Sequence, residues 1–407
     1  MASSSTSLAD STGTYDRGYV FRLAGTFTFG WALIGAVQIM INPLLPFVRE
    51  EFHLSGVETG LLTWAFVLPY LLIQIPSGVF ADRFGAKRVL VTMTLISAVA
   101  VVAQGLWSYG LIAFVGLAVV YCAGSGPYYP IAFGSSTGAA PASARGIVSS
   151  MLVTGMALGS GMGMGFAVPL AELGGGWRFP FLVIGLPMLL LPVIFQLVMR
   201  PTQRKARSTS GKFTTLFADR SLVLLFVVNM LTNIGYAVLM VWGPAFLGNE
   251  RGFSVVVAAA YLALVNVIGF PAGMAVGMLS DRIGRKRLTV SLFAVAGVAL
   301  ALIGGLDQPV FVVAAIVVYG IAGKWTTDGA LAAWMGDRVA ARFPTTGSAV
   351  YGVNNTARVL GVLVAPPIAG AFLDRTGSLV PSFYFGAGIL MIAAILLLLA
   401  SEVREKA

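Results

Sequence analysis

The sequence predicts an all-α membrane protein in which twelve transmembrane helices form two pseudo-symmetric six-helix bundles around a central cavity. Three observations lead to this fold class. Hydrophobic residues make up 57% of the 407 residues and charged residues only 10%, whereas a soluble protein has about 25% charged residues. Twelve apolar segments follow one another along the chain, and the second six repeat features of the first six. The composition therefore argues against a soluble enzyme.

The twelve apolar segments are each long enough to cross a bilayer. They lie at about 24–47, 57–80, 89–107, 110–134, 146–170, 179–199, 222–247, 255–279, 288–305, 309–334, 347–372 and 380–400. A spanning helix needs about 20 apolar residues, and a chain in lipid must satisfy its own backbone hydrogen bonds. Each segment is therefore expected to be a helix, since the shorter alternating segments of a β-barrel are not seen.

The polar stretches between the segments suggest the domain organisation. We expect a Ser- and Thr-rich cytoplasmic tail at 1–21, a first bundle at 22–200 and a basic linker at 201–220. A second bundle at 221–401 and a short cytoplasmic tail at 402–407 complete the chain.

The basic residues indicate the orientation in the membrane. If both termini are cytoplasmic, the inner connections hold 20 of the 26 Lys and Arg residues and the outer connections hold four. Basic residues favour cytoplasmic loops, so we expect a multi-pass protein of the cytoplasmic (inner) membrane with both termini inside. This distribution accounts for the net charge of +10 without a nucleic-acid partner.

The residues that support catalysis or metal binding are scarce. The chain has one cysteine and one histidine, so it lacks an internal disulfide and a His/Cys cluster for a metal. No nucleophile–base pair or phosphate loop is present either. The sequence therefore predicts no enzyme activity, no cofactor and no metal site.

The two halves of the chain repeat at a fixed spacing. Five residues around the end of the second apolar segment recur 199 positions later: Gly78, Asp82, Gly85, Lys87 and Arg88 correspond to Gly277, Asp281, Gly284, Lys286 and Arg287. Repeats across whole halves are typical of secondary transporters, whose site lies between the repeats near the bilayer midplane.

The sequence resembles the major facilitator superfamily over nearly its whole length. The resemblance lies in GVFADRFGAKR at 78–88 and GMLSDRIGRKR at 277–287, which match that family's G-x-x-x-D-R-x-G-x-[KR]-[KR] loop. It implies that these loops hold the cytoplasmic gate shut, although plain anchoring by basic residues is the alternative. The gating residues expected on this basis are Gly78, Asp82, Arg83, Gly85, Lys87, Arg88, Arg145, Asp281, Arg282 and Arg285. The loop at 373–378 is similar to that of organic-anion transporters of the superfamily.

Three ionisable residues fall inside the predicted membrane segments. Lys324 and Asp328 lie in the tenth segment, four residues apart and hence on one helix face, and Arg358 lies near the middle of the eleventh. Such residues are costly in lipid and are usually functional. Two cations with one acidic partner leave a positive charge that an anionic substrate would neutralise. The alternative is a purely structural ion pair.

Other polar residues share helix faces that would complete a cavity. The resemblance implies that spans one, four, seven and ten line it. The candidates are Gln38, Asn42, Tyr128, Tyr129, Asn233, Tyr236 and Asn354. Each of them could instead make a hydrogen bond between helices. Two prolines in the fourth span, Pro127 and Pro130, are able to interrupt its helix.

The glycines of the fifth span allow two interpretations. Gly146, Gly155, Gly159 and Gly163 follow part of the spacing of the family's drug-antiporter motif, but Ser160 replaces its proline. Small residues at this spacing also form a surface for close helix packing.

These features predict a secondary active transporter that works by alternating access. The leading hypothesis is proton-coupled uptake of a small organic anion, such as a carboxylate, with Lys324 and Arg358 binding the anion and Asp328 carrying the proton. One alternative is proton-coupled efflux of hydrophobic or cationic compounds, and another is anion exchange or facilitated diffusion. The expected partners are a small-molecule substrate, protons and membrane lipid, and the protein is expected to be a monomer.

Overall fold

The computed structural model describes residues 16–140, 145–200, 217–342 and 347–401. No strand occurs in these ranges. Twelve helical segments within them are long and apolar enough to cross a membrane, which confirms the predicted number of spans.

The first half of the chain supplies six of these spans from nine helices. Its helices are α1 (Arg17–Glu51), α2 (Gly56–Ala65), α3 (Leu68–Phe84), α4 (Ala86–Trp107), α5 (Leu111–Ser125), α6 (Tyr128–Ala139), α7 (Arg145–Leu173), α8 (Phe179–Met188) and α9 (Leu190–Val198).

The second half supplies the other six. Its helices are α10 (Arg220–Ala237), the π-helical turn η3 (Val238–Trp242), α11 (Gly243–Asn249), α12 (Val255–Ile283), α13 (Arg285–Gly305), α14 (Pro309–Ala322), α15 (Lys324–Arg342), α16 (Gly347–Thr376) and α17 (Val380–Leu399).

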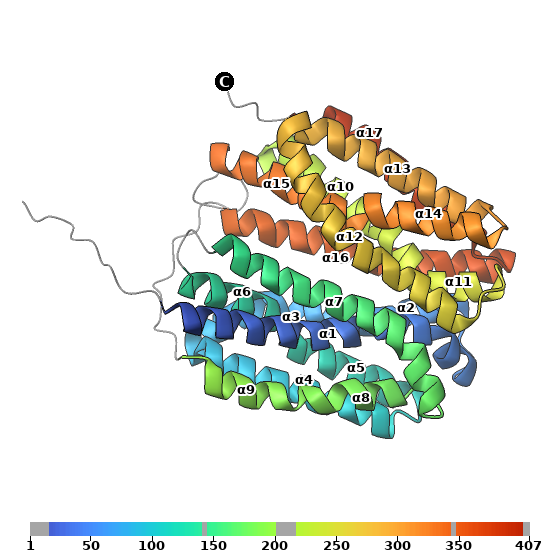
Figure 1. The fold of residues 1–407 in the computed structure, drawn as a ribbon. Coiled ribbons are helices and arrows are strands. Elements are labelled where there is room, and N and C mark those ends of the chain that lie inside the picture. Colours follow the sequence, from blue (N-terminus) through green and yellow to red (C-terminus); the bar gives the residue numbers. More distant parts are fainter. Residues whose placement is uncertain (1–15, 141–144, 201–216, 343–346, 402–407) are drawn as a thin grey trace, which may run out of the picture.

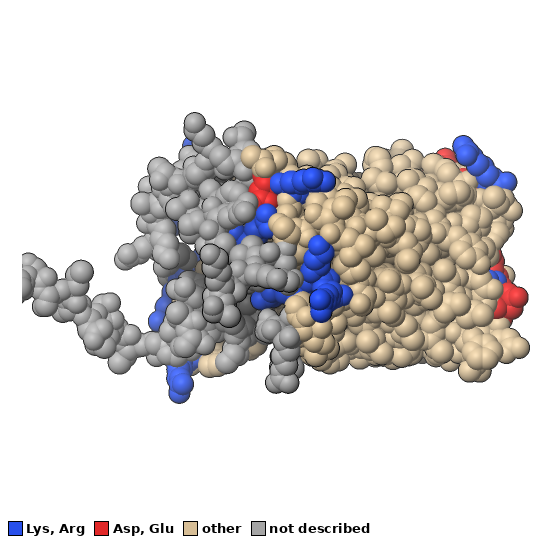
Figure 2. Space-filling view, turned by 90° about the horizontal axis from the view of Figure 1, so that it is seen from above, with Lys and Arg blue, Asp and Glu red and all other residues tan. Residues whose placement is uncertain are grey.

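The helices form two bundles that lie side by side. In Figure 1, α1 to α9 occupy one half of the molecule and α10 to α17 the other, with α7 next to α12 and α2 next to α16 across the boundary. We call the end where α1 begins and α17 ends the terminal face, and the other end the opposite face. On the side that Figure 2 shows, Lys and Arg side chains gather toward the terminal face, and a broad belt without charged side chains separates them from the opposite face.

The two halves share local structure as well as sequence. Gly85, between α3 and α4, has a φ of +90°, and Gly284, between α12 and α13, has a φ of +100°. Only glycine adopts such a backbone without strain. At the opposite face, Glu51 forms an ion pair with Arg178 at the start of the sixth span, and its repeat Glu250 accepts a hydrogen bond from the Leu379 amide at 2.6 Å. Equivalent glutamates in the two halves therefore link the first span of each half to its last span.

Several spans are interrupted where the sequence holds glycine or proline. α5 ends at Ser125 and α6 begins at Tyr128, so Pro127 interrupts the fourth span as the sequence suggested. The break at Gly323 between α14 and α15, and the π-helical turn η3 in the seventh span, were not expected. Both unexpected irregularities lie next to the cavity described below.

The glycines of α7 allow two helix backbones to approach closely. A Cβ atom added at one of three glycines of α7 would collide with a backbone carbonyl group of α1: Gly155 with Thr28, Gly159 with Ala32 and Gly163 with Ala36. These residues form the packing surface that was one of the two interpretations of the pattern. Gly146, the first residue of that pattern, has its surroundings outside the described residues.

Candidate functional site

A cavity of about 340 Å³ lies between the two bundles and is lined from both. Its size falls at the lower end of the range for small-molecule sites, about 300–1,000 Å³. Seven of the residues expected at the site line it: Gln38, Asn42, Tyr129, Asn233, Tyr236, Lys324 and Arg358. The sequence-based expectation thus selected side chains that the fold brings together from five spans.

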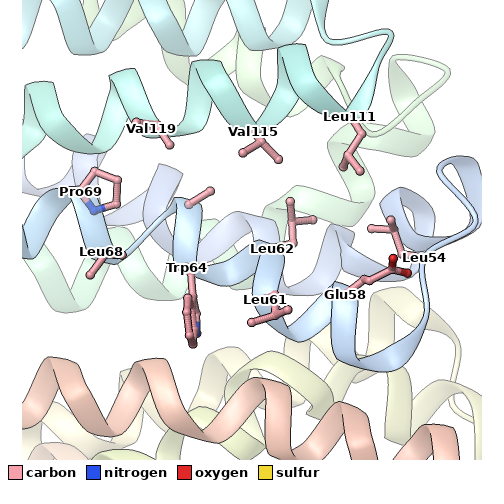
Figure 3. A pocket seen from close by; sticks show the side chains of 11 residues that line it. Leu54, Glu58, Leu61, Leu62, Trp64, Leu68, Pro69, Leu111, Val115 and Val119 are labelled. Carbon is pink, nitrogen blue, oxygen red and sulfur yellow. The ribbon is translucent and has the colours of Figure 1, made fainter.

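A second hollow, of about 420 Å³, lies within the first bundle on α2, α3 and α5 (Figure 3). Its lining is apolar apart from Glu58. The Glu58 carboxylate accepts hydrogen bonds from the backbone amide and the hydroxyl of Ser55, both at 2.9 Å. The described lining of this hollow contains no basic side chain, and its carboxylate caps its own helix. We therefore place the candidate substrate site in the cavity between the bundles.

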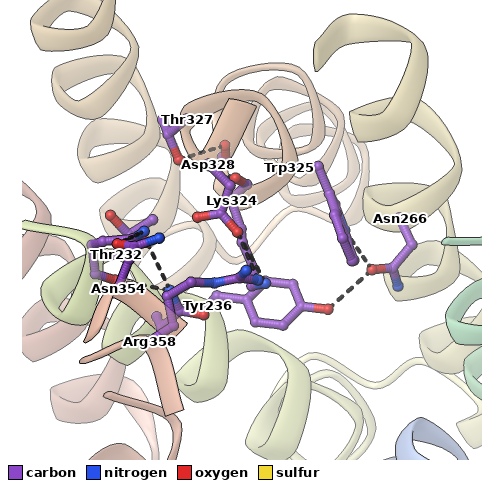
Figure 4. Close-up of polar contacts among 12 residues, drawn as sticks. Thr232, Tyr236, Asn266, Lys324, Trp325, Thr327, Asp328, Asn354 and Arg358 are labelled. Atoms are coloured by element: carbon purple, nitrogen blue, oxygen red, sulfur yellow. Dashed lines mark hydrogen bonds and ion pairs between the residues drawn. The ribbon is translucent and has the colours of Figure 1, made fainter. Parts of the chain in front are cut away.

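One carboxylate oxygen joins the three ionisable residues (Figure 4). Asp328 Oδ2 accepts from Lys324 Nζ at 3.2 Å and from Arg358 Nη2 at 3.0 Å. The side chains are largely buried, with exposed fractions of 7% for Lys324, 14% for Asp328 and 32% for Arg358. Two cations share one anion, so the ionised group carries a net charge of +1.

Two of these three residues keep unused hydrogen-bonding capacity. Asp328 Oδ1 and Arg358 Nε are buried and have no hydrogen-bond partner among the described atoms. Leaving such groups unpaired is costly in a low-dielectric interior, and a purely structural ion pair gains nothing from it. The arrangement is suited to a site whose partners change.

A helix break places a second positive element beside Lys324. α14 ends with the Gly323 amide donating to the Tyr319 carbonyl at 2.7 Å, and Lys324 is the first residue of α15. The N-terminus of α15 therefore lies inside the membrane, next to the cavity. A helix N-terminus carries a partial positive charge and favours anions, and broken helices present such ends to substrates in other transporters.

Two aromatic rings flank the Lys324 ammonium. Its Nζ lies 4.9 Å from the centre of the Tyr236 ring and 4.6 Å from that of Trp325, which is within the range of cation–π attraction. The buried Asn266 Oδ1 accepts from the Tyr236 hydroxyl at 3.0 Å and from Trp325 Nε1 at 2.9 Å. A single amide oxygen thus fixes both rings.

Sequence reasoning missed Asn266. The signal that could have identified it is an asparagine inside the apolar eighth segment, because a polar side chain within the membrane needs hydrogen-bond partners. Its partners Tyr236 and Trp325 come from two other helices, α10 and α15.

Asn354 lies behind the cavity rather than in its lining. Asn229 Nδ2 donates to Asn354 Oδ1 at 2.8 Å, and Asn233 Nδ2 donates to the Asn229 carbonyl at 2.8 Å. This chain of amides links α10 to α16 one turn from Arg358. The adjacent Asn355 lines the cavity instead.

Tyr128 also lies outside the cavity lining. It is buried, its hydroxyl donates to the Phe27 carbonyl at 2.8 Å, and its ring stacks on Trp31. Tyr128 therefore holds α6 against α1, while its neighbour Tyr129 faces the cavity.

The expected gating residues lie at the ends of helices near the terminal face. The surroundings of five of them lie outside the described residues: Gly78, Asp82, Arg145, Asp281 and Arg282. Arg83 and Arg88 are exposed, and Lys87 and Arg285 lie in the first turns of α4 and α13. Lys286, next to Arg285, donates to the Leu398 carbonyl at 2.6 Å at the end of α17.

Hydrogen bonds between the bundles close the opposite face along α2 and α16. The Asp374 carboxylate accepts from the Gly56 amide at 2.6 Å and from the Val57 amide at 2.8 Å, at the N-terminus of α2. Near the other end of α2, Trp64 Nε1 donates to the Leu363 carbonyl of α16 at 2.7 Å. We call this contact the α2–α16 seam.

No group of three or more His, Cys, Asp or Glu residues suited to a metal ion occurs in the described part of the chain. The buried charges of the cavity are paired with each other instead.

The family model of the Major Facilitator Superfamily matches residues 27–357. This chain belongs to that superfamily. It is a transporter with twelve membrane-spanning helices and not an enzyme. The resemblance seen in the loops at 78–88 and 277–287 is thereby confirmed.

Individual relatives differ in what their names say they carry. A probable sulfoacetate transporter from Cupriavidus necator is 26% identical over 386 residues, covering 88% of this chain and 88% of the relative. A cis,cis-muconate transport protein from Acinetobacter baylyi is 26% identical, with coverages of 91% and 94%. A multidrug efflux protein from Bacillus subtilis is also 26% identical, with coverages of 91% and 92%.

Among solved structures, a bacterial homologue of the human lysosomal transporter Spinster, in an inward-facing and unoccupied conformation, is similar with a TM-score of 0.77. It is 18% identical and the match covers 94% of this chain and 96% of that structure. This likeness concerns the fold.

Proposed function

We propose that this transporter takes up a small organic anion together with protons by alternating access. The observation that carries the proposal is the single carboxylate oxygen of Asp328 shared by Lys324 and Arg358. These two are the only charged side chains lining the cavity among the described residues, and both are basic. The sulfoacetate and muconate relatives add support, because their printed substrates are organic anions.

In this proposal Arg358 is the main anion-binding group. It is the most exposed of the three residues, and its Nε has no hydrogen-bond partner in the part of the chain that the structure describes. A guanidinium can bind a carboxylate through two parallel hydrogen bonds, whereas a lysine acts as a point charge. Lys324 and the N-terminus of α15 would add positive potential on the same side of the cavity.

Asp328 is the proposed proton carrier. While ionised, it occupies both cations through one oxygen. When a proton binds to its carboxylate, the charge that holds Lys324 and Arg358 is lost and both become available to the substrate anion. Proton and anion binding then favour each other, and this coupling is reciprocal by linkage.

For the orientation, we propose that the terminal face is cytoplasmic in the inner membrane. The excess of Lys and Arg in the connections on that side supports this. The repeated loops with Asp82 and Asp281 would then form the cytoplasmic gate, and the α2–α16 seam the outer one.

Export of hydrophobic or cationic compounds is the second candidate. The aromatic residues in the cavity lining and the multidrug efflux relative favour it. A cationic substrate would nevertheless have to enter a cavity whose described charged lining is entirely basic. Anion exchange, with Asp328 purely structural, is the third.

Transport in proteoliposomes tests these alternatives. Arg358→Ala should abolish uptake of small carboxylates, Arg358→Lys should restore part of it, and Arg375→Ala, an exposed arginine on the same helix, should leave it unchanged. Equal uptake by Arg358→Ala and Arg375→Ala would remove Arg358 from the site.

Asp328→Asn separates the coupling modes. We expect this variant to lose accumulation driven by a pH gradient while it still exchanges external for internal anion. Full gradient-driven accumulation by Asp328→Asn would contradict its role as the proton carrier. Wild-type protein that exchanges anions without responding to a pH gradient would identify an exchanger.

A further inference from the structure

We propose that the transported anion has a planar apolar body, such as a benzene or indole ring, that lies against an aromatic wall on the first bundle. This inference rests on the proposed function and specifies its substrate class. The aromatic wall consists of Trp31 on α1 and of Tyr129 and Phe133 on α6.

The three rings form a continuous surface in the cavity lining. The ring centres of Trp31 and Tyr129 lie 5.6 Å apart, and those of Tyr129 and Phe133 lie 4.6 Å apart. Both distances are typical of interacting aromatic pairs, about 4.5–7 Å. Tyr129 keeps an exposed fraction of 41% although it lies within a transmembrane span and lines the cavity. Its ring is therefore accessible to a ligand.

The wall and the cationic side belong to different bundles. Lys324 and Arg358 come from α15 and α16 of the second bundle, and they line the same cavity as Tyr129. Val153 and Met156 on α7 continue the lining of the first bundle with apolar side chains. A bound molecule would thus meet a guanidinium at one end and aromatic and aliphatic carbon beside its body.

This polarity disfavours a compact dianion. A second carboxylate pointing toward the first bundle would meet only neutral polar groups such as Gln38 and Asn42, and no basic side chain, in the described lining there, and burying a charge without an opposite charge is unfavourable. An aromatic ring at the same place would gain from apolar burial and from ring stacking. The cavity of about 340 Å³ suits one ring system with a short acidic side chain.

Calorimetric titration of the purified full-length chain tests the inference. We expect phenylacetate and indole-3-acetate to bind at least tenfold more tightly than acetate, and more tightly than succinate or tartrate. Tyr129→Ala should reduce the affinity ratio of phenylacetate to acetate about tenfold, and Tyr129→Phe, which keeps the ring, should retain it. Trp107→Ala, which removes an exposed aromatic residue at the opposite face, is the control and should leave the ratio unchanged.

The outcomes separate this inference from the proposed function. If succinate or tartrate binds more tightly than phenylacetate, or if Tyr129→Ala keeps the affinity ratio of phenylacetate to acetate, the inference of an aromatic substrate is wrong, but the proposal of an anion site is not contradicted. If no carboxylate binds and lipophilic cations do, both are overturned and export becomes the function. Loss of phenylacetate binding in Arg358→Ala together with a lowered ratio in Tyr129→Ala would support both.

Discussion

Removal of the Asp374 carboxylate should open the opposite face. Asp374 lies in the last turn of α16 of the second bundle, and its carboxylate accepts hydrogen bonds from two backbone amides at the start of α2 in the first, at 2.6 and 2.8 Å. Its two oxygens therefore connect the bundles at the point where the seam meets the solvent. An anion at a helix N-terminus is also favoured by the helix dipole.

The expected size of the effect follows from these contacts. Hydrogen bonds to a charged group contribute about 1.5–3 kcal/mol each, and an exposed helix-end charge adds about 0.3–1 kcal/mol. These contributions sum to more than about 3 kcal/mol, but Asp374 is exposed, so water would replace part of them in the open state and we take a smaller value for the whole carboxylate. Asp374→Ala should then weaken the closed seam by about 2 kcal/mol, which changes its population relative to the open state roughly 30-fold. Asp374→Asn, which keeps a neutral acceptor, should have a smaller effect.

Distance measurements between spin labels would detect this change. Cysteines at Tyr109 in the first bundle and Val310 in the second, both about three-quarters exposed at the opposite face, provide label sites in a Cys122→Ser background. Asp374→Ala should add a population with a longer distance. Asp307→Ala is the matched control, since its carboxylate is 92% exposed and pairs within its own bundle. Identical distance distributions for the two variants would refute the reasoning.

Three further changes test packing and site geometry. Asp219 and Arg338 form a buried ion pair at 2.9 Å; burial raises the pKa of Asp219, but hydrogen bonds from Arg338 and two amides outweigh it and hold this pKa below its ordinary value. Asp219→Asn should therefore lower the free energy of unfolding by about 3–5 kcal/mol near pH 7. In the wild type this stabilisation is present near pH 7 and is lost as the pH falls through the lowered pKa of Asp219, so a plot of Tm against pH should differ between the two proteins. Gly159→Ala should lower Tm because its Cβ would meet an α1 carbonyl, whereas Gly161→Ala, which faces ordinary contact distances, should not. Asn266→Leu would leave the buried Tyr236 hydroxyl and the partly buried Trp325 Nε1 without their shared acceptor, at about 1–3 kcal/mol for a buried donor. Both Tm and the affinity for the anion should then fall, and an unchanged affinity would contradict the positioning role of Asn266.

The fold was predictable because its determinants are local in sequence. The length of an apolar segment decides whether it spans a membrane, and the repeat at 78–88 and 277–287 identifies two related halves. Lys324 and Asp328 were expected on one face because they are four residues apart on a helix, and the structure joins them at 3.2 Å. Arg358 was expected near the middle of its own segment, and the structure brings it to the same carboxylate at 3.0 Å.

The features that were missed depend on how helices approach one another. Asn266 binds two aromatic side chains from two other helices, and no spacing in the sequence encodes that meeting. Asp374 belongs to the loop noted for its family resemblance, but its contact with α2 joins residues more than 300 positions apart. The break at Gly323 was not expected because the mean hydropathy of the segment 309–334 gives one span despite Lys324 and Asp328, and hydropathy does not register a change in backbone direction.

The proposed anion site and the α2–α16 seam share one helix. Arg358 and Asp374 both belong to α16, and at 1.5 Å per residue they lie about 24 Å apart along its axis. Pro366 and Pro367 lie between them and deprive the helix of two backbone donors. The Pro366 carbonyl is held by Trp242 Nε1 at 3.0 Å, next to the π-helical turn of the seventh span. A ligand that displaces Arg358 from Asp328 therefore acts on a helix whose other half is bonded both to α2 and to the seventh span. We expect α16 to bend at Pro366 and Pro367 when the seam opens.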